Sequence, residues 1–587
     1  MTPTPVLLRR GAPPRQRILA AVFVAVASGA AAGAAARAAD VDPVVLEAER
    51  SRVDAIRRAS AAAVSIFAGE AGGGSGVLLT PDGYAATNFH VVQPAGPALT
   101  CGLSDGRLHD AVLVGIDPTG DLALVKLLGR DDFPCAELAD SDLVDVGDFC
   151  FAAGNPFLLA TDLRPSISAG IVSGVHRYQF PAGTILEYTD CLQVDAAINP
   201  GNSGGGLFDA QGRLIGVNGR ASFEKRGRVN VGAGYAISSN QVRNFLGCLR
   251  AGRICDHATL GATVSTSAEG RVVVSDILES SDAWRRGLRY DDEIVALAGR
   301  PVRSVNAFKN VLGTLPAGWQ VPLVSRRGGR RFEMLVRLAA IHAPAELAAI
   351  VAGGAEEEKP RQGGEAAKPE LPEAVRGLHE PRSGFANHHF NVVERDRVAA
   401  AIAAARGSLP SGPWVFAGRL ATGDEFRIEL SDTSASIDLP TGTSTLAVDD
   451  ALDRSPVPPG SGGMLAALVL WRQLVTAGPA AVGRTIFWGT APRDPAKLGD
   501  AAIVEFVDVL ESAASGVEAR FAVDGGRVVA IDLWTSPDAE PCEIRLVWND
   551  AGEAGSQAMP ARLEVSRGGQ EFGTFVIEPA APQGVSP

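Results

Sequence analysis

The sequence predicts a mostly β, multidomain protein, and three observations support that prediction. The chain has 587 residues, more than the roughly 250 to 300 at which a single hydrophobic core stops growing, so several domains are expected. Its 67 glycines and only 6% aromatic residues are typical of many tight turns in a strand-rich architecture. Short apolar runs separated by Gly, Pro, Asp and Asn extend from residue 76 to residue 237, which indicates an all-β sandwich or a pair of barrels.

The N-terminal segment, residues 1–38, is typical of an export signal. Four arginines precede an apolar run over residues 18–31, and Ala36, Arg37 and Ala38 form a small-residue cleavage site. We therefore expect an exported protein cleaved after Ala38. A retained membrane anchor is the alternative, because residues 18–36 approach the ~20 residues needed to span a bilayer.

Net charge and cysteine spacing exclude two classes of function. The formal net charge of −13 would repel nucleic-acid phosphates, and no cluster of Lys and Arg in the body of the chain offers an exception. The seven cysteines lack the paired two-residue spacing of zinc or redox sites, so neither a metal nor a cofactor is expected. Buried free thiols are the expectation for most of them.

The first folded unit is predicted to lie between two helices. Residues 41–61 suit an amphipathic helix that places Val45, Leu46, Val53 and Ile56 on one face. Strands are expected near residues 76–79, 111–115, 122–127, 149–153, 168–172, 214–217 and 232–237. A closing helix follows Ser238 or Ser239, because apolar residues recur there at helical spacing.

Two further units follow. The second covers residues 256–340, with strands near 271–277, 293–297, 321–325 and 332–336 and short helices at 281–286 and 304–312. Residues 352–376 are rich in Glu, Lys, Pro, Gly and Ala and have almost no large apolar side chains, so a linker is predicted over residues 341–381. Residues 382–587 are expected to form an α+β domain in which one antiparallel sheet packs against a helix, with a hairpin at Asp524 and Gly525.

Ser203 is the candidate nucleophile of the first unit. It lies in the glycine-rich run at residues 199–206, where glycines on both sides permit a tight turn and a close approach of substrate to the backbone. Such a turn can direct the amides of Gly201 and Ser203 at one point, which would make an oxyanion hole.

A serine hydroxyl needs a general base, and His90 is the best placed of the eight histidines, because it follows a predicted strand. The base in turn needs a carboxylate, and Asp121 heads the apolar run 122–127. His90, Asp121 and Ser203 lie 31 and 82 residues apart, in an order compatible with a nucleophilic triad.

Several segments of the first unit resemble the HtrA/Deg serine proteases. The resemblance covers about residues 50–250 and is carried by residues 74–76, 87–92, 120–126, 153–157, 193–205 and 234–237. It implies a chymotrypsin-like double β-barrel over residues 39–255, with His90, Asp121 and Ser203 as the catalytic triad. One departure is Gly206, where the family usually has proline.

The resemblance also implies a specificity. In chymotrypsin-like proteases the residue six before the nucleophile lies at the base of the primary pocket, and here it is Ala197. With Ala236 and Ile237 as walls, the pocket is expected to accept small or medium apolar residues rather than Lys or Arg.

The second unit resembles the PDZ domain that follows the protease in this family. The recognisable pieces are residues 283–288, 291–294 and 299–302, while Leu260, Gly261 and Ala262 correspond to a carboxylate-binding loop for peptide C-termini. The resemblance to the HtrA/Deg proteases further implies a periplasmic endopeptidase that degrades unfolded or misfolded proteins. It also implies a homotrimer or larger oligomer.

Two other functions compete with this interpretation. A catalytically weak chaperone or scaffold would keep the PDZ-like unit and hold partner chains without cleaving them. A hydrolase of small esters is disfavoured, because the nucleophile lacks the G-x-S-x-G strand-to-helix turn of that class. Residues 382–587 carry no convergent catalytic set and are assigned only accessory binding.

Overall fold

Six antiparallel strands close the first barrel in a computed structural model of the chain. The structure describes residues 41–68, 72–155, 161–180, 185–223, 230–353, 371–407, 412–448, 451–454, 456–499, 504–549 and 559–578. The strands run in the order β1, β2, β3, β6, β5, β4, and β4 pairs with β1 to complete the closure. Their bounds are Ala63–Phe67 (β1), Gly73–Leu78 (β2), Tyr84–Thr87 (β3), Ala98–Leu103 (β4), Leu108–Asp117 (β5) and Leu122–Leu127 (β6).

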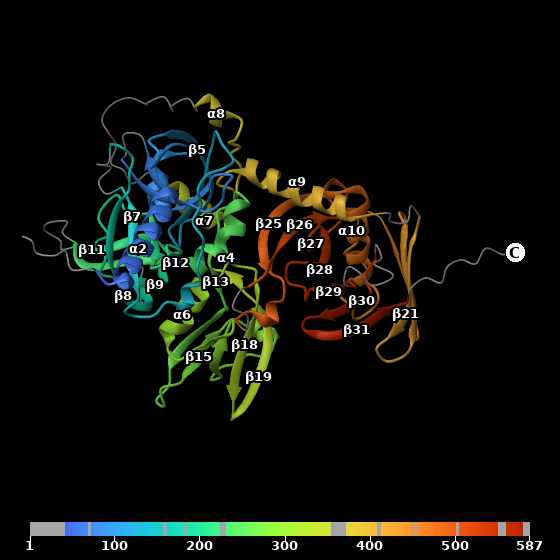
Figure 1. Cartoon of the computed structure of the whole chain (residues 1–587). Coiled ribbons are helices and arrows are strands. Elements are labelled where there is room, and N and C mark those ends of the chain that lie inside the picture. The colour runs from blue at the N-terminus through green and yellow to red at the C-terminus, as the bar shows by residue number, and fades with distance from the viewer. Residues whose placement is uncertain are drawn as a thin grey trace, which may run out of the picture. The chain divides into compact units, whose positions relative to one another are not determined.

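A second six-stranded barrel follows in the order β10, β11, β12, β9, β8, β7, closed by the pairing of β7 with β10. Its strands are Phe149–Gly154 (β7), Ser166–Gln179 (β8), Tyr188–Val194 (β9), Gly206–Asp209 (β10), Leu214–Phe223 (β11) and Asn230–Ser238 (β12). Helix α4, Ser239–Arg250, begins where the Ser238 hydroxyl accepts a hydrogen bond from the Gln241 amide. The two barrels confirm the predicted chymotrypsin-like fold (Figure 1).

The leading helix exists, but its predicted apolar face is wrong. Helix α2 spans Pro43–Ala62, and its buried residues are Ala55, Ala59 and Ala62. Val45, Leu46 and Val53 are exposed instead. Alanines allow the close approach, since a Cβ on Gly212 would lie only 2.8 Å from the Ala55 carbonyl oxygen. The signal segment, residues 1–38, lies outside the described residues, among which no helix is long and apolar enough to cross a membrane.

The second unit is α+β, as predicted. Its main sheet has the order β14, β15, β16, β18, β19, with the short strand β17 on β16, and β13 pairs with β20. The strands are Ala258–Thr259 (β13), Ala262–Thr266 (β14), Val272–Ile277 (β15), Glu293–Leu297 (β16), Arg300–Pro301 (β17), Gln320–Arg327 (β18), Arg330–Arg337 (β19) and Ala339–Ala340 (β20). Helices α5, Asp282–Arg285, and α6, Val305–Gly313, start behind Ser281 and Ser304, whose hydroxyls cap them.

The predicted linker contains helices α7, Pro344–Gly353, and α8, Glu373–Arg376, while residues 354–370 lie outside the described part of the chain. Helix α9, His388–Ala405, opens the third unit. The predicted boundaries between the units stay predictions, because cores are shared: Trp488 and Val509 of the third unit pack with Trp319 of the second.

One antiparallel sheet of eleven strands organises the third unit (Figure 1), which confirms the predicted α+β class. Its order is β24, β23, β22, β21, β31, β30, β29, β28, β27, β26, β25. The strands are Trp414–Leu420 (β21), Glu425–Leu430 (β22), Ser434–Leu439 (β23), Gly442–Ala447 (β24), Arg484–Pro492 (β25), Phe506–Ala514 (β26), Val517–Asp524 (β27), Arg527–Trp534 (β28), Cys542–Val547 (β29), Arg562–Arg567 (β30) and Gln570–Ile577 (β31).

Sequence analysis missed a helix and shifted a turn in this unit. Helix α10, Met464–Ala477, is buried against the sheet almost all round, so its sequence carries no amphipathic period. The hairpin between β27 and β28 pairs Asp524 with Arg527, so its two loop residues are Gly525 and Gly526, one position later than predicted. Both have positive φ, as a type I′ turn requires.

One disulfide forms within the described residues, between Cys248 in α4 and Cys255 just after it. The other five cysteines are free, and Cys135 alone among those five is exposed. The expectation of buried free thiols therefore holds for Cys101, Cys150, Cys191 and Cys542.

Removal of this disulfide should destabilise the end of the first unit. We expect a variant with both Cys248→Ser and Cys255→Ser to lose about 2.5 kcal/mol in the free energy of unfolding, because the closed loop is short. Urea unfolding under non-reducing conditions measures the difference, and Cys135→Ser is the matched control. An unchanged urea midpoint in the double variant would contradict the pairing.

Candidate active site

A buried carboxylate holds the histidine of the candidate site. Asp121 is fully buried, and its side chain accepts hydrogen bonds from His90 Nδ1 at 2.8 and 3.0 Å and from the His90 backbone amide at 3.0 Å. With Nδ1 engaged, the neutral imidazole carries its proton on that nitrogen and keeps Nε2 as an acceptor. Among the residues that the structure describes, His90 Nε2 has no hydrogen-bond partner.

The backbone of Asp121 fixes the same pair from the other side. Its carbonyl accepts hydrogen bonds from Asn88 Nδ2 at 3.0 Å and from the Phe89 amide at 3.2 Å. His90 lies in the short helix α3, Phe89–Val92, which follows β3, and Asp121 precedes β6, the neighbour of β3 in the barrel. Asp121 has a φ of 58°, a left-handed conformation that aspartate tolerates better than most residues. Adjacent strands thus bring two distant residues together.

The pKa of His90 is raised above its ordinary value. Burial by itself lowers the pKa, but the hydrogen bond and the negative charge of Asp121 outweigh that effect. The imidazole side chain nevertheless remains 47% exposed, so one face of the ring is open. A partly exposed, carboxylate-supported imidazole is the arrangement of a general base.

Ser203 lies in a turn that only glycine can complete. Gly204 has a φ of 84°, and a Cβ there would lie 2.2 Å from the Ser75 carbonyl oxygen and 2.3 Å from Thr87 Oγ1. The turn is tied to β2 through the Ser75 amide, which donates to the Ser203 carbonyl at 2.9 Å, and through Ser75 Oγ, which donates to the Gly201 carbonyl at 2.6 Å. The turn is therefore held rigidly against the first barrel.

The same contacts bring the Ser203 turn next to the His90 helix. A Cβ on Gly74 would lie 3.0 Å from the Ser203 carbonyl oxygen and 2.8 Å from a methyl carbon of Val91, the residue after His90. Gly204 likewise approaches the amide nitrogen of Asn88. The structure therefore gathers the three predicted residues, His90, Asp121 and Ser203, into one region between the barrels.

The Ser203 hydroxyl is hydrogen-bonded to a backbone carbonyl and not to the histidine. Its Oγ donates to the Gly219 carbonyl at 3.2 Å, and no hydrogen bond joins it to His90 within the described residues. The amides of Gly201 and Ser203 donate no hydrogen bond to any described residue, whereas those of Asn202, Gly204 and Gly205 all do. Two main-chain donors are thus unclaimed beside the hydroxyl.

Gly206 keeps its strand in register despite the departure from the family pattern. It pairs with Ala153 and Val217 at the start of β10. A side chain there would meet the Phe208 ring at 2.5 Å, so the packing of Phe208 takes the space that a larger residue would need.

Sequence analysis missed Tyr188, which completes the carboxylate site. The Tyr188 hydroxyl donates to Asp121 Oδ2 at 2.5 Å, and its ring packs under Gly219. Tyr188 lies in β9 of the second barrel, so it links that barrel to a carboxylate held by the first. No local motif could have found it, because the contact spans 67 residues of sequence.

The turn before Asp121 is braced by another buried pair. Asp117 accepts a hydrogen bond from the Gly120 amide at 2.8 Å, and His257 Nε2 lies 2.9 Å from Asp117 Oδ2. Both side chains are almost completely buried. Burial lowers the pKa of His257, but the charge of Asp117 outweighs it and the pKa is raised.

The predicted pocket residues differ in exposure. Ala197 is exposed, and its carbonyl accepts hydrogen bonds from Ser168 Oγ at 2.8 Å and from Asn202 Nδ2 at 3.3 Å. Ala236 and Ile237 lie in β12 and are buried in the cores of the barrels. The pocket assignment stays a prediction.

The predicted carboxylate-binding loop lies beside an edge strand. Gly261 has a φ of 69°, its carbonyl accepts the Leu278 amide, and its own amide donates to Thr259 Oγ1. Leu260 is buried, and Ala262 begins β14, which pairs only with β15 among the described strands. A role in binding peptide C-termini stays a prediction.

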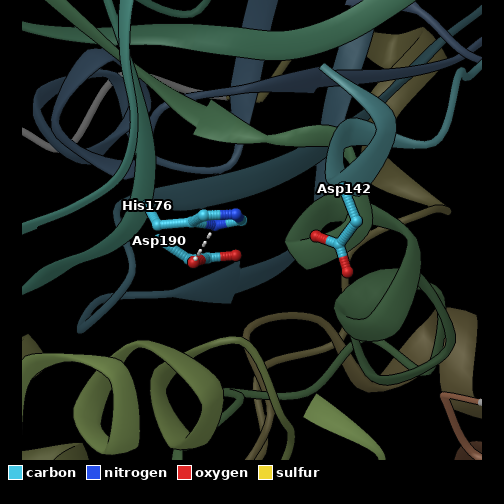
Figure 2. A group of neighbouring side chains, drawn as sticks. All are labelled: Asp142, His176 and Asp190. Carbon is cyan, nitrogen blue, oxygen red and sulfur yellow. Dashed lines mark hydrogen bonds and ion pairs between the residues drawn. The ribbon is translucent and has the colours of Figure 1, made fainter. Parts of the chain in front are cut away.

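One group of described side chains has the composition of a metal site. Asp142, His176 and Asp190 lie together in Figure 2, with a hydrogen bond between His176 Nδ1 and Asp190. The guanidinium of Arg300 contacts both Asp190 oxygens at 2.8 and 2.9 Å and lies 4.0 Å from Asp142. Arg300 therefore supplies the positive charge that these carboxylates pair with.

Known proteins are similar in sequence to part of this chain. The trypsin-like peptidase domain model matches residues 74–217, which include His90, Asp121 and Ser203. The chain is 36% identical over 277 residues to periplasmic serine endoprotease DegP of Escherichia coli K12, covering 45% of this chain and 56% of that protein. It is 32% identical over 288 residues to a probable periplasmic serine endoprotease DegP-like of Chlamydia muridarum, covering 47% and 56%.

A solved structure of the HtrA-type protease AlgW with a tripeptide is 30% identical, with a TM-score of 0.41, over 50% of this chain and 98% of that one. The chain spans 56% of the length of the two DegP relatives. Taken with the two barrels, the family match defines a trypsin-like peptidase domain. The sequence identities further show that this domain is HtrA-like, as the motifs predicted.

Removal of the Tyr188 hydroxyl should raise the pKa of His90 further. The Asp121 carboxylate would lose a donor that shares its negative charge, so the imidazolium would be more strongly stabilised. In an NMR titration of ring-labelled histidine, we expect wild-type His90 to titrate above about pH 6.5 and Tyr188→Phe to titrate higher. Tyr178→Phe, which removes a tyrosine bonded to Glu187 instead, is the control. A lower pKa in Tyr188→Phe would contradict the geometry.

Proposed function

We propose that the chain is an exported serine endopeptidase that cleaves unfolded or misfolded proteins with His90, Asp121 and Ser203. The observation that carries the proposal is the Asp121–His90 pair beside a rigid turn in which the amides of Gly201 and Ser203 donate to no described residue. The likeness to proteins named periplasmic serine endoproteases supports the activity and a periplasmic location. Residues 1–38 would direct the export.

The reaction begins when the Ser203 hydroxyl turns from the Gly219 carbonyl to His90 Nε2. Catalytic hydrogen bonds are often long or misaligned without substrate, so this rotation is compatible with activity. His90 removes the proton as Ser203 Oγ attacks the peptide carbonyl, and it then protonates the leaving amine. Water hydrolyses the acyl-enzyme by the same route, and no metal or cofactor takes part.

The turn stabilises the transition state by electrostatics. As the carbonyl oxygen becomes an oxyanion, the amides of Gly201 and Ser203 can donate to it without reorganising, because other hydrogen bonds already fix the turn. Each such donor contributes about 3 to 4 kcal/mol in measured cases. Asp121 holds and stabilises the imidazolium throughout.

The free edge of β14 supports a role for the second unit in binding peptide C-termini, next to Leu260, Gly261 and Ala262. A homotrimer or larger assembly is part of the proposal, and light scattering on the purified chain tests it.

A catalytically weak chaperone is the second candidate function. The hydrogen bond of Ser203 Oγ to the Gly219 carbonyl favours it, because the hydroxyl is engaged away from its base. The two candidates differ in a simple outcome, since a chaperone would hold unfolded chains without shortening them.

Replacement of the nucleophile should abolish proteolysis. Ser203→Ala removes the attacking atom, and we expect casein degradation to fall by at least about 10⁴-fold while the thermal unfolding curve is unchanged. Ser444→Ala, in β24 of the third unit, is the matched control and should retain full activity. Casein degradation at the wild-type rate by Ser203→Ala would refute the assignment.

The pocket prediction is tested by reporter peptides. An uncharged base at Ala197 should give faster cleavage after Val or Ala than after Lys or Arg, and Ala197→Asp should shift the preference toward Lys and Arg by placing a carboxylate there. Values of kcat/KM on matched peptides measure both effects. Rapid cleavage after Lys or Arg by the wild type, with none after Val or Ala, would overturn the prediction.

A further inference from the structure

A large cavity lies away from the Ser203 turn, between the second and third units. Its volume is about 1230 Å³, and one wall is strand β19 with the end of helix α5, while the other is the sheet from β25 to β31. Small-molecule pockets usually occupy roughly 300 to 1,000 Å³, so this cavity is large enough for a longer ligand. Neither the triad nor the Leu260 to Ala262 loop lines it.

Strand β19 is an edge strand of its sheet, and it lines the cavity through Glu333, Met334, Leu335 and Arg337. It pairs with β18 and with no other described strand. The Arg337 amide faces away from β18, because it donates to Asp282 Oδ2 at 2.6 Å. Backbone groups alternate along an antiparallel strand, so Leu335 and Glu333 face the same way as Arg337. Leu335 lies opposite Pro322 on β18. Proline has no amide to donate, which agrees with a pair at this position whose backbone groups point away from each other.

The cavity wall combines apolar and small side chains. Met334 of β19 and Trp548 beyond β29 are half-buried there. Ala522 and Ala530 lie opposite each other on β27 and β28 and leave space above the sheet. An extended chain placed along β19 would therefore find room for its side chains against this face.

Charged groups of both signs line the same cavity. Arg286 is 6% exposed, and its Nη2 has no hydrogen-bond acceptor, although Glu543 lies 3.5 Å away. Arg337 contacts Asp532 at 2.7 Å, and its Nε is also unpartnered. A buried guanidinium nitrogen without an acceptor indicates a site for a carbonyl or carboxylate oxygen of a ligand.

This balance of charge narrows the class of ligand. The lining carries both signs in nearly equal number, not the single basic surface expected for a polyphosphate or nucleic acid. Its acidic residues are Glu333, Asp494, Asp532, Glu543, Glu564 and Glu571, and its basic residues are Arg285, Arg286, Arg337, Arg493, Lys497, Arg520, Arg545 and Arg562. The same charges make it unsuitable for a lipid chain, which needs an apolar wall. A polypeptide segment offers amides for β19, carbonyls or carboxylates for Arg286, and side chains for the sheet face.

We propose that this cavity binds an extended segment of an unfolded polypeptide, which adds as a strand to the free edge of β19 and offers an oxygen acceptor to Arg286. The site holds substrate at a distance from the Ser203 turn and is separate from the β14 edge. Binding there does not require catalysis, so it can be tested in a chain that cannot cleave.

The first experiment places a large side chain in the cavity at Ala530, on the wall formed by the sheet of the third unit. The probe is fluorescein-labelled casein, and its Kd for the full chain carrying Ser203→Ala is measured by fluorescence anisotropy. Adding Ala530→Trp should weaken binding by about tenfold or more, since the indole occupies the peptide's place. Adding Ala417→Trp, at an exposed position of β21 on the same sheet, should leave the Kd unchanged.

The second experiment needs no substitution in the cavity. Hydrogen exchange is followed by mass spectrometry for the Ser203→Ala chain with and without saturating casein. The peptide that covers Arg330–Arg337 should exchange about tenfold more slowly when casein is bound, because the outward amides of β19 become hydrogen-bonded. Unchanged exchange there with casein bound, protection of Ala262–Thr266 alone, or full affinity in a folded Ala530→Trp variant would each overturn the proposal.

Discussion

The candidate site depends on the burial of one carboxylate. Asp121 is removed from solvent, and an ion in such a place is tolerated only when its oxygens are hydrogen-bonded. His90 satisfies them twice and Tyr188 once, from two different barrels. The imidazole is thereby fixed in one tautomer with Nε2 free. The buried carboxylate of Asp121 therefore needs donors from both barrels, and this need holds the barrels together alongside their hydrophobic packing.

The nucleophile turn obeys a second constraint, which is steric. Ser203 can approach the first barrel only because Gly204 and Gly74 carry no side chains where Ser75, Thr87 and Val91 press against them. Ser75 holds the turn, and two of its amides, those of Gly201 and Ser203, donate to no residue in the part of the chain that the structure describes. The close packing of the turn against the first barrel accounts both for its rigidity and for the two donors without a described partner. A glycine-rich turn held in this way can take part in catalysis.

Sequence predicted these features where they are local and failed where they are not. The approximate positions of the strands, the cap at Ser238 and the candidate residues His90, Asp121 and Ser203 follow from short motifs. Tyr188 and the His257–Asp117 pair depend instead on contacts across the fold. Helix α10 was missed because it is apolar on nearly every face, and the face of α2 was misassigned because alanines, not larger side chains, pack there. The cavity beside β19 is likewise built from distant segments whose sequences carry no shared pattern.

The most direct test of the central claim is labelling of the full chain by a serine-directed fluorophosphonate, with the adduct located by mass spectrometry. A functional site of this geometry should give one adduct, on Ser203, which disappears in His90→Ala and is strongly reduced in Asp121→Asn. Absence of labelling at Ser203 in the folded chain, or labelling there that is equally fast without His90, would contradict the account.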